Sequence, residues 1–201
     1  LLLFKPQAPK PYARIPFPDS YRIGDTYSML VYDIKPDEFE YAFSFDGPYE
    51  PAKGLLFNEE NVLLDPYSRA VTGQRKWGEK PEGGKDFEYR ARVVKSSFDW
   101  GNIKQLEQPF EDLVIYEIHV RGYTKDKSSG VSAPGTFAGL KDKIPYLKDL
   151  GINAVELMPI FEFDEMESAR VVDGVQLYNY WGYNTVSFLS LIHISEPTRP
   201  Y

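Results

Sequence analysis

The clearest alternation of side chains in the chain lies at residues 39–45, where an aromatic residue occupies every second position. The four rings belong to Phe39, Tyr41, Phe43 and Phe45, and the positions between them hold Glu, Ala and Ser. Because successive side chains of a strand point to opposite faces, this pattern predicts a strand with four rings on one face. We expect it to end at the Asp-Gly-Pro sequence of residues 46–48, since proline cannot continue a ladder.

Other parts of the first half also have the character of short strands. Residues 26–32 and 89–94 are candidate strands, and connections rich in Pro and Gly separate them, as at residues 6–18 and 80–85. Short strands joined by such turns are typical of a β-sandwich. We therefore predict an all-β first domain over residues 1–109. The chain has no starting Met, and we expect the N-terminus of this domain to be missing.

The pattern changes after residue 109, where longer apolar segments begin. Residues 113–120 are almost continuously apolar, which is typical of a strand covered on both faces. Apolar residues then recur at spacings of three and four over residues 137–147, which predicts one face of a helix. Residues 152–158 form the next predicted strand.

Signals at both ends of the predicted helix define it further. Thr136 is a candidate N-cap, and Gly151 lies where a helix C-terminal glycine is expected. Pro145 removes a backbone donor, so we expect a kink or two short helices. Strand, helix and strand at this spacing predict a βαβ unit with parallel strands. By itself this unit is compatible with a (β/α)8 barrel and with a doubly wound sheet.

Composition narrows the range of partners. The net charge is −7 and no run of Lys or Arg exceeds two residues, which argues against a nucleic-acid partner. No apolar run approaches the ~20 residues of a membrane helix. The absence of Cys excludes disulfides and thiolate metal sites and agrees with a cytoplasmic location. The chain has 15 Tyr, 13 Phe and 3 Trp, which suit sugar stacking or a sheet core, and composition alone favours the core.

Several motifs, in consistent order along the chain, resemble those of the α-amylase superfamily of glycoside hydrolases, in its isoamylase and glycogen-debranching branch. The matching residues are 43–49, 54, 57–58 and 62–67 (end of a carbohydrate-binding-type sandwich), 112–124 (first barrel strand and turn), 134–151 (first barrel helix), 153–159 (second strand) and 180–184 (a sugar-facing segment). The resemblance implies a truncated fragment of such an enzyme. Its expected fold is an incomplete, immunoglobulin-like β-sandwich followed by the first βαβ segment of a (β/α)8 TIM-type barrel.

The same resemblance implies domains, activity and partners. The sandwich covers residues 1–109, the start of the barrel residues 110–188, and residues 189–201 resemble translated adapter sequence, a non-native tail in which His193 has no role. The implied activity is retaining hydrolysis of α-1,6 branch linkages in glycogen, amylopectin or limit dextrin by two carboxylates, without a cofactor. In the family these carboxylates lie on later barrel strands, so we expect no catalytic residue here and an inactive chain. The alternatives are a non-catalytic α-glucan-binding module and a fragment of a branching enzyme.

Two aromatic residues are the candidate substrate-binding residues. Tyr183 resembles the tyrosine that stacks on the sugar at the cleavage point, and Trp181 lies two residues before it. An aromatic face suits the apolar C–H face of glucose. The alternative for Tyr183 is a buried core position. For His119 the expected role is a hydrogen-bonded structural histidine rather than a general base.

Acidic residues are the remaining candidates for chemistry. Glu117 and Glu156 lie inside apolar strands, and Arg121 is a candidate partner for one of them in a structural ion pair. A second acidic group follows the second strand and consists of Glu162, Asp164, Glu165, Glu167 and Asp173. Such a run can supply oxygen ligands for Ca²⁺, but its spacing does not match an EF-hand. We expect solvated side chains and no metal site.

Overall fold

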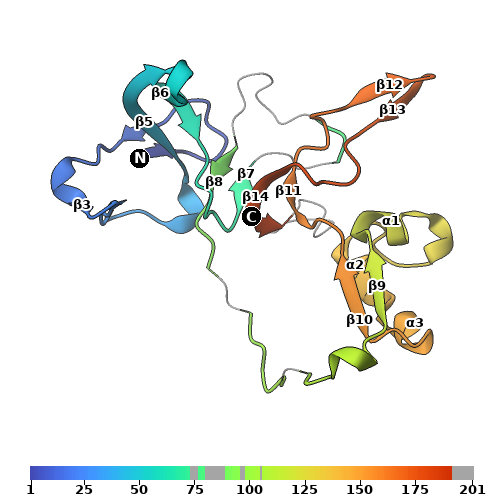
Figure 1. Cartoon of the computed structure of the whole chain (residues 1–201). Helices are drawn as coiled ribbons and strands as arrows, with labels where there is room; N and C mark the ends of the chain where they lie inside the picture. The colour runs from blue at the N-terminus through green and yellow to red at the C-terminus, as the bar shows by residue number, and fades with distance from the viewer. Residues whose placement is uncertain (73–76, 80–88, 96–97, 105, 192–201) are drawn as a thin grey trace. The chain divides into compact units, whose positions relative to one another are not determined.

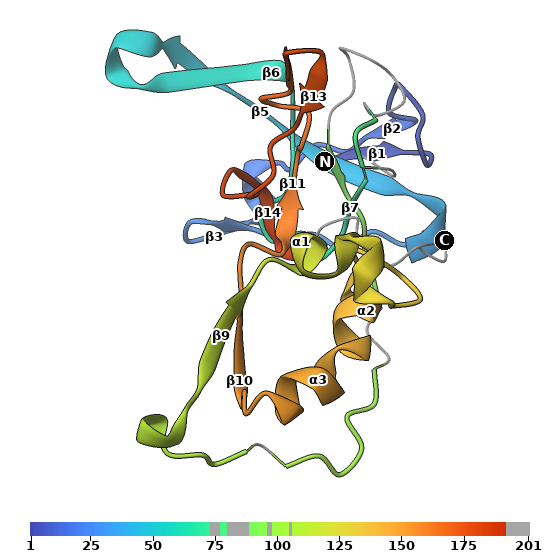
Figure 2. The same ribbon diagram turned by 90° about the vertical axis from the view of Figure 1, so that its right-hand side faces the viewer.

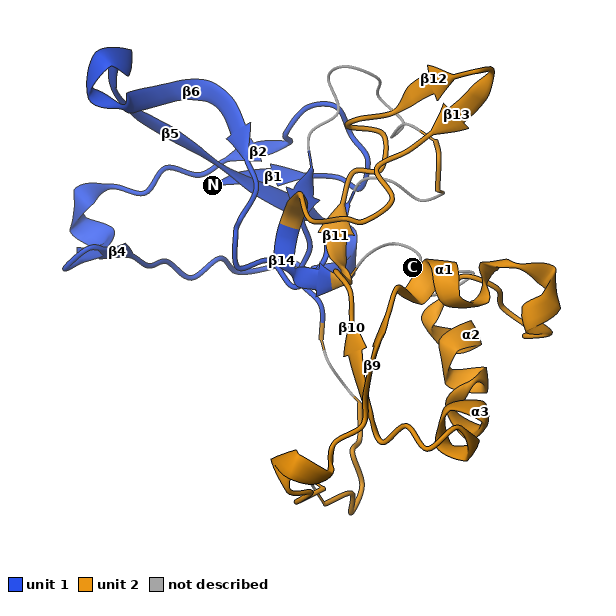
Figure 3. Cartoon of the chain, turned by 45° about the vertical axis from the view of Figure 1, so that its right-hand side comes forward, with its two compact units in different colours: residues 1–75, 80–94, 187–190 blue, residues 76–79, 95–186, 191–201 orange. Residues whose placement is uncertain are grey.

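The computed structural model describes residues 1–72, 77–79, 89–95, 98–104 and 106–191. The predicted connection at residues 80–85 and residues 192–201 of the predicted tail, including His193, lie outside these ranges. The chain divides into two compact units (Figure 3). Unit 1 comprises residues 1–75, 80–94 and 187–190, and unit 2 comprises residues 76–79, 95–186 and 191–201.

Unit 1 is built on one antiparallel sheet in the order β2-β1-β5-β8-β7, with β6 paired to β5 (Figure 1). The strands are β1 (Leu2–Phe4), β2 (Ala13–Arg14), β5 (Glu40–Glu50), β6 (Leu55–Leu63), β7 (Val71–Thr72) and β8 (Arg90–Ala91), and β3 (Arg22–Ile23) pairs separately with β4 (Thr26–Tyr27). Short 3-10 helices are η1 (Asp19–Tyr21), η2 (Pro36–Glu38) and η3 (Pro51–Lys53). Among the described residues up to 109 there is no α-helix, as the sequence predicts.

The aromatic alternation forms a row of touching rings along β5. Centroids of successive rings in the row from Phe39 to Phe45 lie 6.4, 6.0 and 6.2 Å apart, which confirms the predicted shared face. The opposite face was expected to be the small or polar one, yet it packs into the core. Ala42 is fully buried there with Leu2 and Phe4, and partly buried Val62 packs against them.

Three strand boundaries differ from those predicted. β5 does not end at residues 46–48 but continues to Glu50, because register shifts against β6 accommodate Gly47 and Pro48. A Cβ at Gly47 would lie 2.8 Å from the Phe57 ring, so glycine allows the two strands to approach. The predicted strands at residues 26–32 and 89–94 are reduced to the two-residue strands β4 and β8. The lengths of these strands are set by their pairing with neighbouring strands, which the composition of the segments does not reveal.

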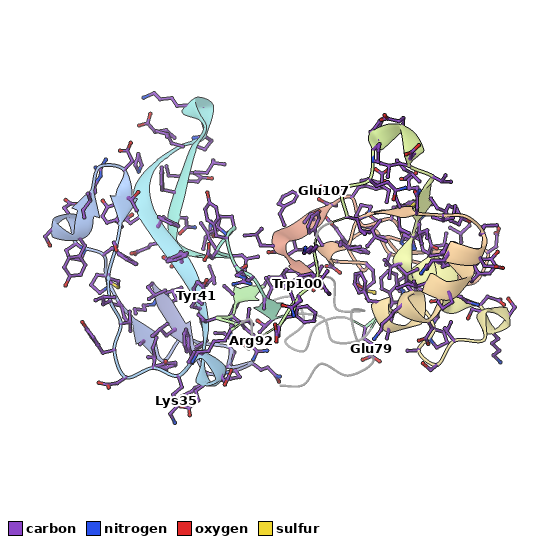
Figure 4. All side chains as sticks on the ribbon, turned by 90° about the horizontal axis from the view of Figure 1, so that it is seen from below. Lys35, Tyr41, Glu79, Arg92, Trp100 and Glu107 are labelled. Atoms are coloured by element: carbon purple, nitrogen blue, oxygen red, sulfur yellow. The ribbon has the colours of Figure 1, made fainter. Side chains whose placement is uncertain are left out.

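Tyr41 provides a pH-dependent link within unit 1; it is labelled in Figure 4. Its hydroxyl donates to Asp65 Oδ2 at 2.6 Å. Burial raises the pKa of Tyr41 well above its ordinary value, and the hydrogen bond and charge of Asp65 raise it further. Above a pH of about 10 the unfolded chain releases this proton while the folded chain retains it. Folding stability should therefore fall as the pH rises through about 10.

The prediction for Tyr41 concerns the difference between wild type and Tyr41→Phe. At pH 8 the variant should be less stable by about 1 kcal/mol, the net value of one hydrogen bond. By pH 11 this difference should shrink, because phenylalanine has no proton to release. Urea unfolding midpoints of both chains at pH 8 and pH 11 measure the change. A difference that stays constant with pH would contradict the assignment.

Unit 2 contains the short helix η5 (Phe110–Asp112) and a parallel pair of strands, β9 (Ile115–Ile118) and β10 (Ala154–Leu157). The chain leaves β9 through the helices α1 (Val120–Lys125), η6 (Lys127–Ser129), α2 (Phe137–Asp142) and α3 (Ile144–Asp149) and returns to β10 (Figure 2). Parallel pairing of the two predicted strands is thus confirmed. The expectation that the first strand is covered on both faces is wrong for this chain. Ile115 is 50% exposed, and of the four β9 residues only Ile118 is buried.

The predicted helix signals hold in α2 and α3. The Thr136 side chain accepts from Gly139 N–H at 3.1 Å, as an N-cap does. The helix breaks at Lys143, two residues before Pro145, which gives the two short helices expected. Gly151 follows the second helix with φ +89°, a conformation that favours glycine.

Short strands follow β10: β11 (Phe161–Phe163), β12 (Arg170–Val172), β13 (Val175–Leu177) and β14 (Thr185–Leu191). β12 and β13 form an antiparallel hairpin, and both turn residues, Asp173 and Gly174, have positive φ. Residues 189–191 of the predicted non-native tail belong to β14. None of the helices in the described residues has the length and apolar character needed to cross a membrane.

Candidate functional site

The predicted substrate-binding aromatics lie in unit 2 on the segment between β13 and β14. The Tyr183 side chain is 71% exposed and the Trp181 side chain 52% exposed. A buried core position for Tyr183 is thereby excluded. Trp181 packs at right angles to Tyr180, with ring centroids 5.1 Å apart. Tyr183 therefore presents a ring to which a flat ligand has access.

The backbone before Tyr183 makes a tight turn over a buried ring. Gly182 has φ +76°, and a Cβ at this position would lie 2.5 Å from Phe163 Cε1. Phe163 is 1% exposed and belongs to the second hydrophobic cluster, against which Trp77 and Phe137 pack. Only glycine fits this turn, both for its conformation and for its contact with Phe163. The position of the exposed Tyr183 thus depends on a buried contact.

Asn179 fastens the same segment at its start. Its backbone N–H donates to the Glu165 carbonyl at 2.8 Å, and its side-chain oxygen accepts from Gly182 N–H at 3.4 Å. Glu165 itself is fully buried, and its Oε1 accepts from Gly78 N–H at 2.6 Å. These bonds join three separate parts of unit 2 around the segment that carries Tyr183.

Trp77 and Arg121 complete this support, and sequence reasoning missed Trp77. The Trp77 ring meets Phe163 edge to face, with centroids 5.8 Å apart, and the Arg121 guanidinium lies 4.2 Å from the Trp77 centroid. Burial lowers the pKa of Arg121, and the nearby Glu165 charge counteracts this shift. A lone Trp in a Gly- and Lys-rich stretch carries no periodic signal, so only tertiary contacts identify it.

Two predictions about acidic residues are wrong. The run from Glu162 to Asp173 is not simply solvated, because Glu162 is 2% exposed and Glu165 fully buried. The second prediction is a structural ion pair between Arg121 and either Glu117 or Glu156, the glutamates of the two apolar strands. Both are exposed, at one register of the β9–β10 pair, and Arg121 lies against Trp77 instead. Water solvates the two glutamates, so neither requires an ion pair.

His119 contacts Tyr180 and Trp181, of which Trp181 is a substrate-binding candidate, and it belongs to a hydrogen-bonded structure. It is the N-cap of α1, where Nδ1 accepts from Gly122 N–H at 2.9 Å. Its Nε2 lies 2.9 Å from the Tyr180 carbonyl oxygen, and its ring stacks on Tyr180 with centroids 4.2 Å apart. Both ring nitrogens are thus engaged, which confirms the predicted structural histidine.

The arrangement offers aromatic surface for binding. Within the described residues, no group of three or more His, Asp or Glu side chains is placed to hold a metal ion. Trp181 and Tyr183 supply exposed rings, and the polar groups behind them are engaged in holding the backbone. Such a surface can bind a ligand that has flat apolar faces and polar edges.

Comparison with known proteins identifies relatives over most of the chain. No protein-family model matches it. It is 40% identical over 179 residues to isoamylase 1, chloroplastic, of Arabidopsis thaliana. The aligned region covers 86% of this chain and 23% of that protein. It is 36% identical over 189 residues to the glycogen debranching enzyme of Yersinia enterocolitica, which covers 87% of this chain and 27% of that enzyme. The chain therefore spans about a quarter of the length of the curated relatives it matches.

Two solved structures of pullulanases are also similar to this chain. The pullulanase SAP of Group B Streptococcus has a TM-score of 0.51 and 27% identity, covering 68% of this chain and 19% of that one. Pullulanase type I of Bacillus subtilis, solved with maltose, has a TM-score of 0.54 and 22% identity, covering 81% and 21%, and supports the fold alone. Over the residues that match, the chain is similar in sequence to isoamylases and glycogen debranching enzymes, at 36–40% identity to the two relatives named above.

Proposed function

We propose that this chain is part of an enzyme that hydrolyses α-1,6 branch linkages in glycogen or starch-type glucans. The observation that carries the proposal is the identity of 36–42% to named isoamylases and a glycogen debranching enzyme over more than four fifths of the chain. The substrates would be branched α-glucans, that is, glycogen, amylopectin or limit dextrin. The reaction would be retaining, with one carboxylate as nucleophile and a second as acid and base.

We further propose how the domains divide this work. Residues 1–109 would form the immunoglobulin-like, carbohydrate-binding-type sandwich, and residues 110–188 the first βαβ segment of a (β/α)8 barrel. The antiparallel sheet of unit 1 supports the first assignment, and the parallel strands β9 and β10 with helices between them support the second. Barrel enzymes place their sites on loops after the strands, and Tyr183 lies on such a connection after β10. The catalytic carboxylates would lie on later strands, outside these 201 residues.

Tyr183 would act by stacking on a glucose ring of the substrate. Its exposed face meets the apolar C–H side of the sugar, while its hydroxyl reaches water or a carboxylate. Trp181 would extend this surface. For the compartment we propose the cytoplasm, on the absence of Cys. The names of the plant relatives place those proteins in chloroplasts, so a plastid is the alternative.

The test is to extend the reading frame in the source DNA and assay the longer enzyme. We expect it to release reducing ends from amylopectin and the 201-residue chain to release none. Tyr183→Ala in the longer enzyme should lower kcat/KM by about tenfold, the equivalent of ~1.4 kcal/mol of lost stacking. Tyr146→Ala on α3, which also removes an exposed tyrosine, is the matched control and should leave kcat/KM near the wild-type value.

Three outcomes of this assay would contradict the proposal. Formation of new α-1,6 branches would indicate a branching enzyme. Glycogen binding without any hydrolysis by the longer protein would indicate a glucan-binding module. An equal loss of kcat/KM in the Tyr183 and Tyr146 variants would remove Tyr183 from the substrate-binding surface.

A further inference from the structure

His119 connects the start of α1 with the aromatic segment, residues 180–183, which begins 61 residues further along the chain. Gly122 N–H can only donate, so Nδ1, which lies 2.9 Å from it, accepts and carries no proton. A backbone carbonyl can only accept, so Nε2, which lies 2.9 Å from the Tyr180 oxygen, donates and carries the proton. The two partners therefore fix one tautomer of a neutral imidazole.

The contacts of the ring reinforce the hydrogen bond. Tyr180 stacks on His119 with centroids 4.2 Å apart and planes 24° apart, and Trp181 meets the same ring at 80° with centroids 5.8 Å apart. Gly122 leaves room for this stack, since a Cβ there would lie 2.0 Å from Tyr180 Oη. Of residues 180–183, His119 thus contacts two: Tyr180 through its ring and its backbone carbonyl, and Trp181 through its ring.

The chain between Tyr180 and Tyr183 is short and has little freedom. Gly182 is held by its N–H bond to Asn179 and by the close approach of its Cα to the buried Phe163 ring. Only two residues separate Tyr180 from Tyr183, so we expect a shift of the Tyr180 carbonyl to disturb Tyr183 as well. Tyr183 is 71% exposed, so its position comes from its backbone rather than from packing of its ring.

We propose that His119, as a neutral imidazole protonated at Nε2, is a positioning residue that holds residues 180–183 in place for stacking on a glucan. The proposal rests on the proposed function for the role of Tyr183. It assigns to His119 no contact with the substrate and no part in proton transfer. Burial of the imidazole, with a smaller effect of the Arg121 charge, lowers the pKa of His119 and favours the same neutral form; the hydrogen bond to the Tyr180 carbonyl counteracts this.

Two substitutions separate the two hydrogen bonds of the imidazole. Asparagine has a carbonyl near the position of Nδ1, so His119→Asn keeps the cap on α1 and loses the bond to Tyr180. Glutamine extends its N–H₂ group towards the position of Nε2, so His119→Gln keeps a donor to Tyr180 and loses the cap. If His119 acts only as a helix cap, His119→Asn should stay closer to wild type than His119→Gln. If it positions residues 180–183, His119→Gln should stay closer to wild type.

The experiment measures maltotetraose binding and amide hydrogen exchange of residues 180–183 in the 201-residue chain and both variants. We expect His119→Asn to lose about fivefold to tenfold in affinity, the equivalent of one net hydrogen bond, with faster exchange at residues 180–183. His119→Gln should stay within about threefold of wild type. In wild type, long-range ¹H–¹⁵N spectra of the imidazole at pH 7 should show the proton on Nε2.

Each readout can overturn the proposal. A proton on Nδ1 in wild type would contradict the proposal. So would a His119→Asn variant with wild-type maltotetraose affinity and wild-type amide exchange. A larger loss of affinity in His119→Gln than in His119→Asn would contradict it as well. If wild type itself binds no maltotetraose, the glucan-binding role of Tyr183 in this chain fails separately. The tautomer and the exchange rates then still decide whether His119 holds the segment.

Discussion

Replacing Arg90 with methionine is expected to destabilise unit 1 by about 3–5 kcal/mol, the cost of removing one partner from a buried ion pair. Arg90 Nη1 lies 3.5 Å from Glu40 Oε2, and the two side chains are only 6% and 4% exposed. Methionine fills much of the same volume but leaves the Glu40 carboxylate without the charge that offsets its burial. Small domains have net stabilities of about 5–15 kcal/mol, so a loss of this size removes a large part of the total.

The contacts around the pair explain why it matters for the fold. The Arg90 guanidinium lies 3.7 Å from the centroid of the Phe4 ring and donates to the Ala8 carbonyl. Glu40 Oε1 accepts from Gln7 N–H at 3.1 Å, and Gln7 has a positive φ of +63°. The pair therefore attaches β1 and the turn after it to the centre of the sheet.

A double variant is the control for Arg90. Combining Arg90→Met with Glu40→Leu replaces both charges by apolar groups, and such replacements are often neutral or stabilising. We expect the double variant to recover most of the stability lost by Arg90→Met. Urea unfolding of wild type, both single variants and the double variant measures the coupling directly. Additive losses in the double variant would show that the two side chains do not act as a pair.

Replacing Gly182 with alanine is expected to displace Tyr183 and thereby to lower the affinity for glucan. Alanine at φ +76° costs about 1–2 kcal/mol in conformational strain. Its Cβ would also lie 2.5 Å from the ring of Phe163, which is buried and cannot move aside freely. Overpacking of this kind costs a further ~1–3 kcal/mol.

Gly174 provides a matched control within the same unit. It has the same φ of +76°, but a Cβ at this position would have nothing within 4 Å. Gly174→Ala therefore introduces the conformational strain without the contact with Phe163. We expect Gly182→Ala to lower maltotetraose affinity at least tenfold and Gly174→Ala to leave it near wild type. Equal effects of the two variants would show that the Phe163 contact does not position Tyr183.

Local sequence signals determined much of this protein. The alternating rings of β5, the Thr136 cap, the break before Pro145 and the turn at Gly151 all follow from the residues involved and their near neighbours. These features depend on φ preferences, missing donors and side-chain alternation, which act over a few positions. The structural role of His119 could also be read from its place near the end of an apolar strand, whereas Tyr183 became a candidate only through the family resemblance.

Tertiary structure decided which polar side chains are buried and what holds the aromatic segment. Glu40 lies on the face of β5 whose residues are small or polar, and Glu165 lies in the acidic run predicted to be solvated, yet both are buried. Glu117 and Glu156, which lie in apolar strands, are exposed. Burial depends on partners distant in sequence, such as Arg90 for Glu40 and Gly78 for Glu165. A single polar position carries no periodicity that reveals such a partner, so the sequence specifies the elements and only the fold assigns these side chains to core or surface.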